Sequence, residues 1–563
     1  MEEEMTSLIK NETWSLVEPP PGRAPIKNRW VFKIKKNGQN NVKFKARLVA
    51  KGFSQRPGID YGETYSPVVK HDSLRTILSL AAARDLELLQ LDVKTAFLNG
   101  DIDEELYMDQ PTGFKEDSKM VCLLKKGLYG LKQASRAWNE KFNHFLIQYG
   151  FTRSDADSCV YFQRDENNIT IMAIWVDDGL LCSNHQSKLE DIVNYLSEKF
   201  EITSGPVDHF VGLEISRDRC KGVIHVSQQA YVKKILTRFR MGDCKPRSIP
   251  ADPCSHLEKQ CSTFETQDYP YREAIGSLMF AAICTRPDIS YAVSQVAKYS
   301  SKPSYVHWEA VKRIFAYLKG TISFGISYFR GVKEGVLLAF SDSDFAGDAD
   351  DRRSTTGNIF ILNGGPVSWR SQKQKCVALS TAESEYIAAS MATKEVVWLR
   401  RLLMEIGCQQ NNSTPLFCDN QSAIRLVYNP EFHQRTKHID VKFHHIRDMQ
   451  IQQEISIQYI PTENQLANAL TKKSNHQKLS KFKHSMECVH LYKLYEMFLS
   501  IQFFSCFVIE WVCWSKSAIW RDVQSLHSHE NGLPTLSTPC SQIKMSVVNV
   551  SSISDISRPH SLQ

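Results

Sequence analysis

Residues 169–181 read ITIMAIWVDDGLL, an apolar run followed by two adjacent aspartates, a glycine and a second apolar run. Apolar runs of this length next to turn residues are typical of buried strands, and Asp and Gly are favoured in turns. The pattern therefore predicts a strand, a tight turn that carries Asp177 and Asp178, and a second strand. Taken alone, such a turn fits an exposed loop better than a functional site, although adjacent carboxylates repel each other unless a cation or solvent compensates them.

The segments on either side of this hairpin predict further strands and helices. Residues 86–93 form a mostly apolar run that predicts a strand ending at Asp92. After the hairpin, apolar residues recur at helical spacing over 189–200, which predicts a helix. Residues 271–284 and 308–318 have the pattern of two amphipathic helices further along the chain.

A basic segment lies near the N-terminus. Residues 19–59 hold eleven Lys and Arg residues and no acid, in a chain whose net charge is only +7. Residues 30–36 and 42–47 alternate between apolar and basic, and Asn37-Gly38 between them is a strong hairpin signal. We predict a two-stranded ribbon with one apolar and one cationic face. Such a ribbon suits a polyanion partner, and it equally suits an edge hairpin whose lysines prevent aggregation.

From about residue 335 the sequence predicts a separate mixed α/β layer. A strand leads into Ser341-Asp342, and a hairpin turned by Asn363-Gly364-Gly365 follows. Residues 380–383 (STAE) have the capping-box pattern, which predicts the start of a long helix ending near Gly407. Single strands are expected at 337–340, 377–379, 416–418 and 455–460, and the two arms of the hairpin contain Phe360 and Val367. Asp419 comes directly after the strand at 416–418, and a short helix is expected at 464–470. The order βββ-α-β-α-β-α is typical of a mixed α/β layer.

Length and composition limit the class of protein. The chain has 563 residues, which at roughly 100–200 residues per domain suggests three or four domains. With 42% hydrophobic and 23% charged residues it is an ordinary globular chain. Fifteen cysteines include no C-x-x-C pair, which argues against a zinc ribbon or knuckle and for reduced thiols. The apolar stretch 497–509 is too short for a membrane span, which needs about 20 residues.

Several stretches resemble motifs of the Ty1/copia retrotransposon group. Residues 91–100 (LDVKTAFLNG) and 175–178 (WVDD) resemble two motifs of reverse transcriptases, and 128–138 (LYGLKQASRAW) and 271–279 (YREAIGSLM) resemble motifs of that group. Three further stretches resemble ribonuclease H motifs of the same elements: 341–348 (SDSDFAGD), 378–386 (ALSTAESEY) and 418–423 (CDNQSA). The resemblance runs from about residue 3 to about residue 488.

The resemblance implies a fold class and an order of domains. The class is α/β (α+β): a right-hand polymerase with fingers and palm, a helical connection region, and then a ribonuclease H-like mixed α/β domain. We expect the reverse transcriptase at residues 1–250, the thumb and connection at 251–335, and the ribonuclease H-like domain at 336–475. Residues 476–563 are expected to be a divergent, poorly ordered tail.

The resemblance also assigns polymerase residues. Asp92, Asp177 and Asp178 are implied as catalytic ligands of two Mg²⁺ ions, with Mn²⁺ as a substitute, held about 4 Å apart. Lys45 and Arg47 on the cationic ribbon would bind the triphosphate of the incoming nucleotide.

Two more polymerase positions follow from the same motifs, and one residue departs from them. Phe97 matches the position where an aromatic ring excludes a ribose 2′-hydroxyl, and Gln133 matches a residue that contacts the nucleotide. The family usually has Tyr where this chain has Trp175, a change expected to affect fidelity or rate rather than metal binding.

For the ribonuclease H-like domain, Asp342, Glu385 and Asp419 are the implied ligands of a second pair of Mg²⁺ ions. Glu383 competes with Glu385, but it already fits the capping-box role. Asp344 and Asp348 are expected to be solvated loop acids.

The fourth ribonuclease H motif departs from the family. The usual Gln-Leu-Ala-Asp is here Gln465-Leu466-Ala467-Asn468, so Asn468 would offer a neutral oxygen to a metal and nuclease activity should be weakened. A histidine-rich stretch has no cysteines nearby, and the family carries a similar one, so we expect structural or substrate-facing histidines rather than a zinc site. Its histidines are His433, His438, His444 and His445.

The implied function is an RNA-directed DNA polymerase joined to ribonuclease H. Its partners would be an RNA template, a DNA primer, the RNA–DNA hybrid and deoxynucleoside triphosphates, with no membrane and with the oligomeric state left open. It would act in cytoplasmic virus-like particles, in the nucleus, or in both. The alternative is a truncated, decayed element product that binds nucleic acid without turnover, because the chain begins inside the leading polymerase segment and its tail matches nothing. A host binding protein that has lost both chemistries is disfavoured by the candidate ligands that remain.

Overall fold

The computed structural model describes residues 1–36, 42–116, 119–165, 168–255, 257–259, 269–331, 335–428 and 440–487. The chain divides into two units, Met1–Leu494 and Tyr495–Gln563, and all described residues belong to the first. The predicted Asn37-Gly38 turn and the apolar stretch 497–509 lie outside the described residues. Within those residues, no helix combines the length and the apolar character that a membrane crossing requires.

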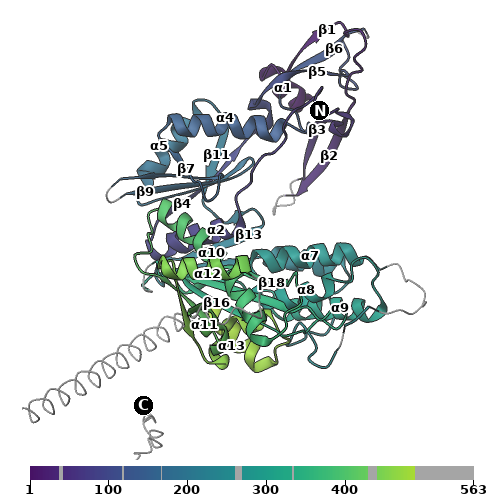
Figure 1. The fold of residues 1–563 in the computed structure, drawn as a ribbon. Coiled ribbons are helices and arrows are strands. Elements are labelled where there is room, and N and C mark those ends of the chain that lie inside the picture. Colours follow the sequence, from purple (N-terminus) through teal and green to yellow (C-terminus); the bar gives the residue numbers. More distant parts are fainter. Residues whose placement is uncertain are drawn as a thin grey trace, which may run out of the picture. The chain divides into compact units, whose positions relative to one another are not determined.

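An antiparallel sheet of six strands contains the predicted aspartate hairpin, in the order β11-β4-β10-β9-β8-β7 (Figure 1). Helices α4 and α5 cover it, because Trp138, Phe142 and Leu196 share one apolar core with Leu91 and Ile174. The elements are β4 (Glu87–Val93), β7 (Thr152–Arg153), β8 (Val160–Arg164), β9 (Ile169–Trp175), β10 (Asp178–Ser183), β11 (Ile202–Gly205), α4 (Ala134–Gln148) and α5 (Gln186–Ser197). The predicted strands and the helix after them are confirmed.

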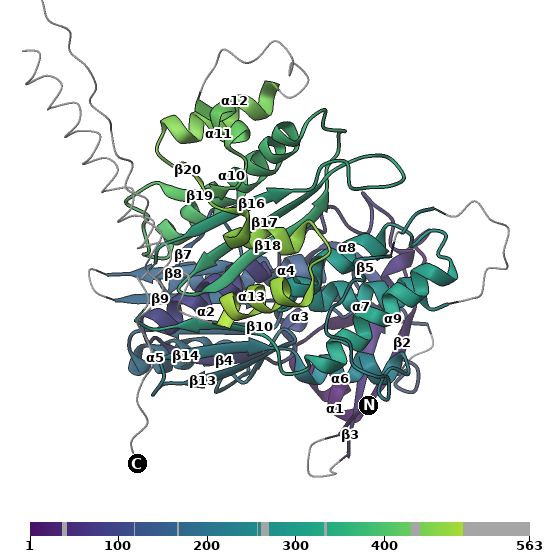
Figure 2. The ribbon, with the colours of Figure 1, turned by 90° about the horizontal axis from the view of Figure 1, so that it is seen from below.

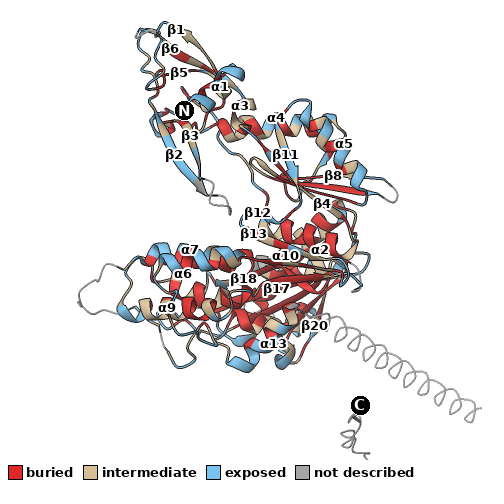
Figure 3. Ribbon diagram, turned by 180° about the vertical axis from the view of Figure 1, so that it is seen from behind, coloured by how far each residue is buried: buried red, intermediate tan, exposed pale blue. Residues whose placement is uncertain are grey.

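The predicted basic ribbon is confirmed as strands β2 (Asn28–Lys36) and β3 (Val42–Ala50). Lys33 pairs with Lys45 on one face and Ile34 with Phe44 on the other, since side chains alternate along a strand. The apolar face is open: Phe32, Ile34 and Phe44 are 68%, 59% and 75% exposed, and much of β2 is coloured as exposed in Figure 3.

The base of the ribbon joins a second core. Leu48 and Ala50 of β3 pack with buried residues of α1 and of a three-stranded sheet with the order β1-β6-β5. These elements are α1 (Glu2–Lys10), β1 (Trp14–Val17), α3 (Ala96–Asn99), β5 (Asp101–Met108) and β6 (Val121–Lys126).

A four-stranded antiparallel sheet, in the order β12-β13-β14-β15, takes strands from both sides of residue 250. Helix α7 has the predicted bounds. Helix α9 begins earlier than predicted, because Ser304 and His307 form a capping box at its start. The elements are β12 (His209–Phe210), β13 (Leu213–Asp218), β14 (Val223–Ser227), β15 (Ile326–Phe329), α2 (His71–Ala83), α6 (Gln229–Arg238), α7 (Tyr271–Cys284), α8 (Ser290–Ala297) and α9 (Tyr305–Gly320).

A five-stranded mixed sheet forms the C-terminal part of the described chain, with the order β18-β17-β16-β19-β20 (Figure 2). The first three strands are antiparallel neighbours, whereas β16, β19 and β20 run parallel. The long helix α10 packs on β16, β17 and β19 and ends before Gly407, whose φ is +77°. The elements are β16 (Leu338–Ser343), β17 (Thr355–Leu362), β18 (Gly365–Lys373), α10 (Thr381–Glu405), β19 (Thr414–Cys418), α11 (Gln421–Tyr428), α12 (Asp440–Ile451), β20 (Ile455–Tyr459), the 3₁₀ helix η6 (Leu466–Leu470) and α13 (His476–Glu487).

Two predictions for this part were wrong. Residues 377–379 form no strand; the third strand is β18, and 377–379 run directly into the cap of α10. Residues 476–487 are not poorly ordered, because α13 buries Leu479, Phe482 and Met486 at helical spacing. These apolar residues are covered by elements far away in sequence, which the local pattern does not reveal.

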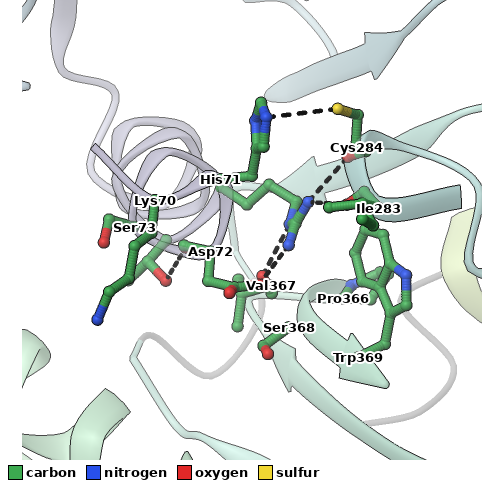
Figure 4. Close-up of polar contacts among 12 residues, drawn as sticks. Lys70, His71, Asp72, Ser73, Ile283, Cys284, Pro366, Val367, Ser368 and Trp369 are labelled. Carbon is green, nitrogen blue, oxygen red and sulfur yellow. Dashed lines mark hydrogen bonds and ion pairs between the residues drawn. The ribbon is translucent and has the colours of Figure 1, made fainter. Parts of the chain in front are cut away.

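A buried arginine on α2 ties three elements together (Figure 4). Arg75 donates from Nε to the carbonyl oxygen of Val367 on β18 at 2.8 Å and from Nη1 to that of Ile283 on α7 at 2.7 Å. Its guanidinium lies 4.0 Å from the ring centre of Trp369 and pairs with Asp72. Because a buried charge is costly unless paired, these bonds define where α2 packs.

Candidate active site

The two aspartate-bearing segments meet at one end of the six-stranded sheet. Asp178 on β10 pairs with Asp92 on β4, and Val176-Asp177 is the two-residue turn between β9 and β10. The N–H of Val93 donates to the carbonyl oxygen of Asp177 at 2.9 Å, which ties the turn to β4. The structure therefore brings Asp92, Asp177 and Asp178 together, as the sequence predicts.

The turn holds a strained residue and a dedicated support. Val176 has φ = +58°, which is a true outlier for a β-branched side chain. The indole Nε1 of Trp138 on α4 donates to the carbonyl oxygen of Val176 at 2.7 Å. Trp138 is itself buried between the rings of Phe142 and Phe200, with centroids 4.9 and 5.3 Å away. Helix α4 thus holds the acidic turn in its unusual conformation.

The carboxylates of Asp92, Asp177 and Asp178 repel one another. Burial, together with the charges of Asp177 and Asp92, raises the pKa of Asp178 to about 6. Burial likewise raises the pKa of Asp177, with a further contribution from Asp92 that Arg47 and Lys45 oppose. Oxygen ligands with unfavourable mutual repulsion suit a divalent cation that is also held by substrate phosphates, so the donor set fits Mg²⁺.

Two basic residues of the cationic ribbon act electrostatically on the Val176-Asp177 turn. Arg47 and Lys45 lower the pKa of Asp177, and both also act on Glu4 of α1, whose pKa burial raises. Arg47 makes no ion pair among the described residues. Lys45 and Arg47 therefore lie near enough to the turn to influence the charge of Asp177, and their binding of a triphosphate stays a prediction.

An aromatic pair lies between these groups. Phe97 on α3 contacts the ring of Tyr129 edge-on, with centroids 4.8 Å apart, and the Arg47 guanidinium lies over that ring, 4.7 Å from its centre. Neither Tyr129 nor Trp138 was assigned a role from the sequence, although both stand in the LYGLKQASRAW stretch. Tyr129 stands next to Gly130 and Trp138 ends the stretch, and the aromatic character of the two residues within this motif is the local signal that could have pointed to them.

Gln133 lies inside a closed hydrogen-bond network. Its Oε1 accepts from Gln55 Nε2 at 2.9 Å, and its Nε2 donates to the carbonyl oxygen of Asp60 at 3.0 Å and to Glu104 Oε2 at 3.2 Å. The side chain is buried. A contact with a nucleotide would require this network to open, so that role stays a prediction.

Trp175, the departure from the family pattern, packs against His71, with ring centroids 5.7 Å apart. His71 Nε2 lies 3.5 Å from Cys284 Sγ (Figure 4). Burial lowers the pKa of His71 to about 4, so the ring is neutral at pH 7. The indole of Trp175 therefore has an uncharged packing partner next to the acidic turn.

A second carboxylate cluster lies on the five-stranded sheet. Asp342 is the penultimate residue of β16, Asp419 follows the neighbouring parallel strand β19, and Glu385 is in the first turns of α10. Ligand oxygens of these three residues lie within 4.8 Å of one another. In the described ranges no other group of three or more His, Cys, Asp or Glu side chains converges so closely. The ligand oxygens of Asp92, Asp177 and Asp178 are therefore more widely spaced than those of this cluster.

This cluster is largely buried and only partly compensated. Burial outweighs the nearby Lys472, whose Nζ lies 3.5 Å from Oδ1, and raises the pKa of Asp342 to about 6. Burial and the charges of Asp342 and Asp419 together raise the pKa of Glu385 to about 9. Asp342 Oδ1 and Glu385 Oε2 are buried without a hydrogen-bond partner. Orphaned buried oxygens of like charge are what a cation would satisfy.

Asn468 on η6 lies beside this cluster. Its Nδ2 donates to the carbonyl oxygen of Thr462 at 2.8 Å, and the hydroxyl of Thr462 donates to Asp419 Oδ2 at 2.8 Å. The Oδ1 of Asn468 is buried without a partner. Asn468 therefore carries an unpartnered neutral oxygen, and its role as a metal ligand stays a prediction.

Glu383 takes the capping role. Its N–H donates to Ser380 Oγ at 3.2 Å, and its Oε2 accepts from the N–H of Leu379 at 2.7 Å. This confirms that Glu385, not Glu383, belongs to the carboxylate cluster.

The expectation that Asp344 and Asp348 are solvated was wrong. Asp348 is buried and pairs with Lys298 Nζ at 2.7 Å and Lys373 Nζ at 2.8 Å. Asp344 accepts from the N–H of Thr355, and burial raises its pKa. Lys298 follows α8 and Lys373 ends β18, so no local pattern in the loop predicts these partners.

We expect Asp348→Asn to lower the free energy of unfolding by about 3 kcal/mol at pH 7, because two lysines lose a buried partner. The hydrogen bonds and charges of Lys298 and Lys373 outweigh burial and hold the pKa of Asp348 below its ordinary value of 3.8. The stabilisation is therefore complete above pH 3.8 and is lost as the pH falls further. Urea unfolding at pH 7 and pH 3 measures this, and an equal difference at both would contradict it.

The histidine-rich stretch is mostly outside the described residues, which exclude His433, His438 and the side chain of His444. His445 Nε2 is buried without a hydrogen-bond partner. Among the described residues no histidine joins a metal-type cluster, and the structural role stays a prediction.

Comparisons with known proteins show which family this chain resembles. Residues 11–253 match the reverse transcriptase (RNA-dependent DNA polymerase) family. The chain is 47% identical over 485 residues to the retrovirus-related Pol polyprotein from transposon TNT 1-94 of Nicotiana tabacum, covering 84% of this chain and 36% of that protein. It is 40% identical over 477 residues to the polyprotein from transposon RE1 of Arabidopsis thaliana, covering 84% and 32%.

A yeast transposon protein and a solved viral structure are also similar to this chain. The Ty5-1 transposon protein of Saccharomyces cerevisiae is 33% identical over 310 residues, which are 54% of this chain and all (100%) of that protein. A solved structure of the foamy viral protease-reverse transcriptase in complex with double-stranded DNA is 11% identical, with a TM-score of 0.47, and the match covers 82% of this chain and 70% of that chain.

The acidic turn on the six-stranded sheet and the family match over it define a reverse transcriptase domain. The chain belongs to the Ty1/copia-type retrotransposon Pol polyprotein family. It spans about a third of the length of the tobacco and Arabidopsis polyproteins.

Proposed function

We propose that this chain is the RNA-directed DNA polymerase of a Ty1/copia-like retrotransposon and that it carries a C-terminal ribonuclease H domain. It would copy element RNA into DNA and degrade the copied template. The observation that carries the polymerase proposal is the meeting of Asp92, Asp177 and Asp178 on adjacent strands, inside the region that matches the reverse transcriptase family.

In this proposal the chain's own residues bind and orient the nucleotide. Lys45 and Arg47 hold the triphosphate near the acidic turn, and Phe97 excludes a ribose 2′-hydroxyl. Asp92, Asp177 and Asp178 would hold two Mg²⁺ ions, or Mn²⁺. When bound, these ions would activate the primer 3′-hydroxyl and stabilise the leaving pyrophosphate.

We expect Trp138→Phe to slow primer extension about tenfold, since the carbonyl of the half-buried Val176 would lose its donor at a cost of about 1–3 kcal/mol. Phenylalanine keeps an aromatic ring between Phe142 and Phe200. The melting temperature should therefore fall by only a few degrees. Single-turnover extension with a saturating nucleotide measures the rate, and a wild-type rate would contradict a role for Trp138 in holding the turn.

The nuclease proposal rests on the second cluster. Asp342, Glu385 and Asp419 converge at one edge of a mixed sheet, and two of their oxygens are buried without partners. These residues, with Asn468, would hold two Mg²⁺ ions that act on the RNA strand of a hybrid, by the same two-metal chemistry. The hybrid would be recognised by shape and backbone.

We expect Asn468→Asp to increase cleavage of an RNA–DNA hybrid by about tenfold at low Mg²⁺ concentration, because a charged oxygen replaces a neutral one beside Asp419. The increase should shrink at high Mg²⁺ concentration, where the weaker site is already filled. Hybrid cleavage measured across a Mg²⁺ titration tests this, and identical curves for both proteins would contradict the account of Asn468.

The domain limits, partners and location are part of the same proposal. We place the reverse transcriptase at 1–250, the thumb and connection at 251–335 and the ribonuclease H-like domain at 336–475, extended by α13. The partners would be an RNA template, a DNA primer, their hybrid and deoxynucleoside triphosphates. The protein would act in cytoplasmic virus-like particles, in the nucleus, or in both.

The polymerase proposal is tested by primer extension. The purified full chain is mixed with a labelled DNA primer annealed to an RNA template, deoxynucleotides and Mg²⁺. Template-dependent extension is expected, with affinity for the primer-template falling as salt rises. If a folded, monodisperse sample binds the primer-template and extends nothing, the chain is a decayed product that binds nucleic acid without turnover.

A further inference from the structure

We propose that Tyr129 is a specificity-determining residue that holds Phe97 and Arg47 in one arrangement, so that the sugar and the triphosphate of a nucleotide are positioned together. This inference rests on the proposed function, because it takes Phe97 as the residue that excludes a 2′-hydroxyl. Tyr129 would act as a positioning residue through its two neighbours.

The contacts of the Tyr129 ring carry the first step. On one side the ring of Phe97 meets it edge-on, at 4.8 Å and an interplanar angle of 63°. On its face lies the guanidinium of Arg47, 4.7 Å from the ring centre. Both are favourable geometries for an aromatic ring. The ring of Tyr129 thus contacts both Phe97 of α3 and Arg47 of β3 at the candidate nucleotide site.

The main chain fixes where the Tyr129 ring stands. The carbonyl oxygen of Tyr129 accepts from the N–H of Ala50 on β3 at 2.8 Å. The next residue, Gly130, has φ = +95°, and a Cβ there would clash with the carbonyl oxygen of Ala50. Because Arg47 and Ala50 belong to the same strand, Tyr129 is locked against the strand that carries the cation.

Tyr129 adds to the packing of its neighbours. Phe97 is partly buried, lies on a helix of four residues and packs against the apolar core of the six-stranded sheet and against the core at the base of the ribbon. The edge-on contact with Tyr129 is an aromatic contact beyond these cores. A Phe97 ring that moves aside would admit a ribose 2′-hydroxyl, whereas a Phe97 ring held in place excludes it. Arg47 makes no ion pair among the described residues, so its stacking on Tyr129 is the contact that orients it.

The electrostatic surroundings agree with this placement. Burial raises the pKa of the Tyr129 phenol, Arg47 lowers it, and the charges of Asp177 and Asp92 raise it. The phenol therefore lies within reach of both the cationic ribbon and the acidic turn, and it stays protonated at neutral pH. The ring, rather than the hydroxyl, makes the contacts that matter here.

The test compares Tyr129→Leu with Tyr129→Phe. Selectivity is the ratio of kcat/KM for a deoxynucleotide to that for the matching ribonucleotide in primer extension. We expect Tyr129→Leu to lower selectivity about tenfold and to raise the deoxynucleotide KM more than it lowers kcat, whereas Tyr129→Phe stays within about twofold of wild type. A general loss of folding would lower kcat for both nucleotides and leave the ratio unchanged.

Phe97→Val provides the reference. If Tyr129 acts through Phe97, the double variant Phe97→Val, Tyr129→Leu should be no less selective than Phe97→Val alone. If Phe97→Val relaxes selectivity and Tyr129→Leu does not, the inference about Tyr129 is wrong and the proposed function stands. If neither variant changes selectivity, the role assigned to Phe97 falls and this inference falls with it.

Discussion

Primer extension by the Asp177→Asn variant is expected to be about a thousandfold slower than by the wild-type chain, a loss of about 4 kcal/mol of transition-state stabilisation. Asp177 lies in the turn that joins β9 and β10, beside Asp178 and Asp92. An amide offers one neutral oxygen where a charged ligand is required. The metal that activates the primer end would therefore be bound less tightly and placed less accurately.

The same substitution should leave the fold intact. The pKa of Asp177 is raised by burial and by Asp92, so removing its charge relieves repulsion and the melting temperature should stay equal or rise. Asp191→Asn is the matched control, because Asp191 is an exposed acid on α5 and its loss should change extension by less than about twofold. Extension by Asp177→Asn within tenfold of wild type would contradict the assignment.

Cleavage of an RNA–DNA hybrid by Glu385→Gln is expected to fall at least about a hundredfold, while primer extension stays within about twofold of wild type. Glu385 on α10 lies in the cluster with Asp342 and Asp419 at the five-stranded sheet, whereas Asp177 lies in the turn of the six-stranded sheet. Glu463→Gln, at an exposed residue, serves as the control. Equal loss of both activities in Glu385→Gln would indicate misfolding or a shared site.

The charge state of Glu385 adds a stability readout. Burial raises its pKa from the ordinary 4.5 to about 9, so the folded protein holds a proton that the unfolded chain releases between these values. Without divalent ions, stability should therefore fall as the pH rises from 4.5 to 9. Glu385→Gln should flatten this slope and should reduce the rise in melting temperature that Mg²⁺ gives the wild type.

The parts of the fold that the sequence predicts are those whose signal is local. The hairpin around Asp177 follows from two apolar runs and a turn, and the ribbon follows from strict alternation around Asn37-Gly38. Helix α7 has the bounds that its apolar spacing predicts. The convergence of Asp342, Glu385 and Asp419 followed from family motifs, and the structure brings them within ligand distance.

The parts that the sequence does not predict depend on distant partners. Asp348 looks like a loop acid until Lys298 and Lys373 reach it from two other elements. Gln133 was assigned to the nucleotide, yet the structure encloses it in a network with Gln55 and neighbouring groups. Tyr129 gains its role only when β3 and α3 lie on either side of it. Such tertiary contacts leave no periodicity in the chain.

The central claim is that this chain carries two separate carboxylate centres, one that extends DNA and one that cleaves RNA. A single reaction tests it most directly: a labelled DNA primer on a separately labelled RNA template, with deoxynucleotides and Mg²⁺, followed for both products. The account predicts that the wild type extends and cleaves, that Asp177→Asn only cleaves, and that Glu385→Gln only extends. A folded wild type that yields neither product, or a variant that loses both activities together, would contradict it.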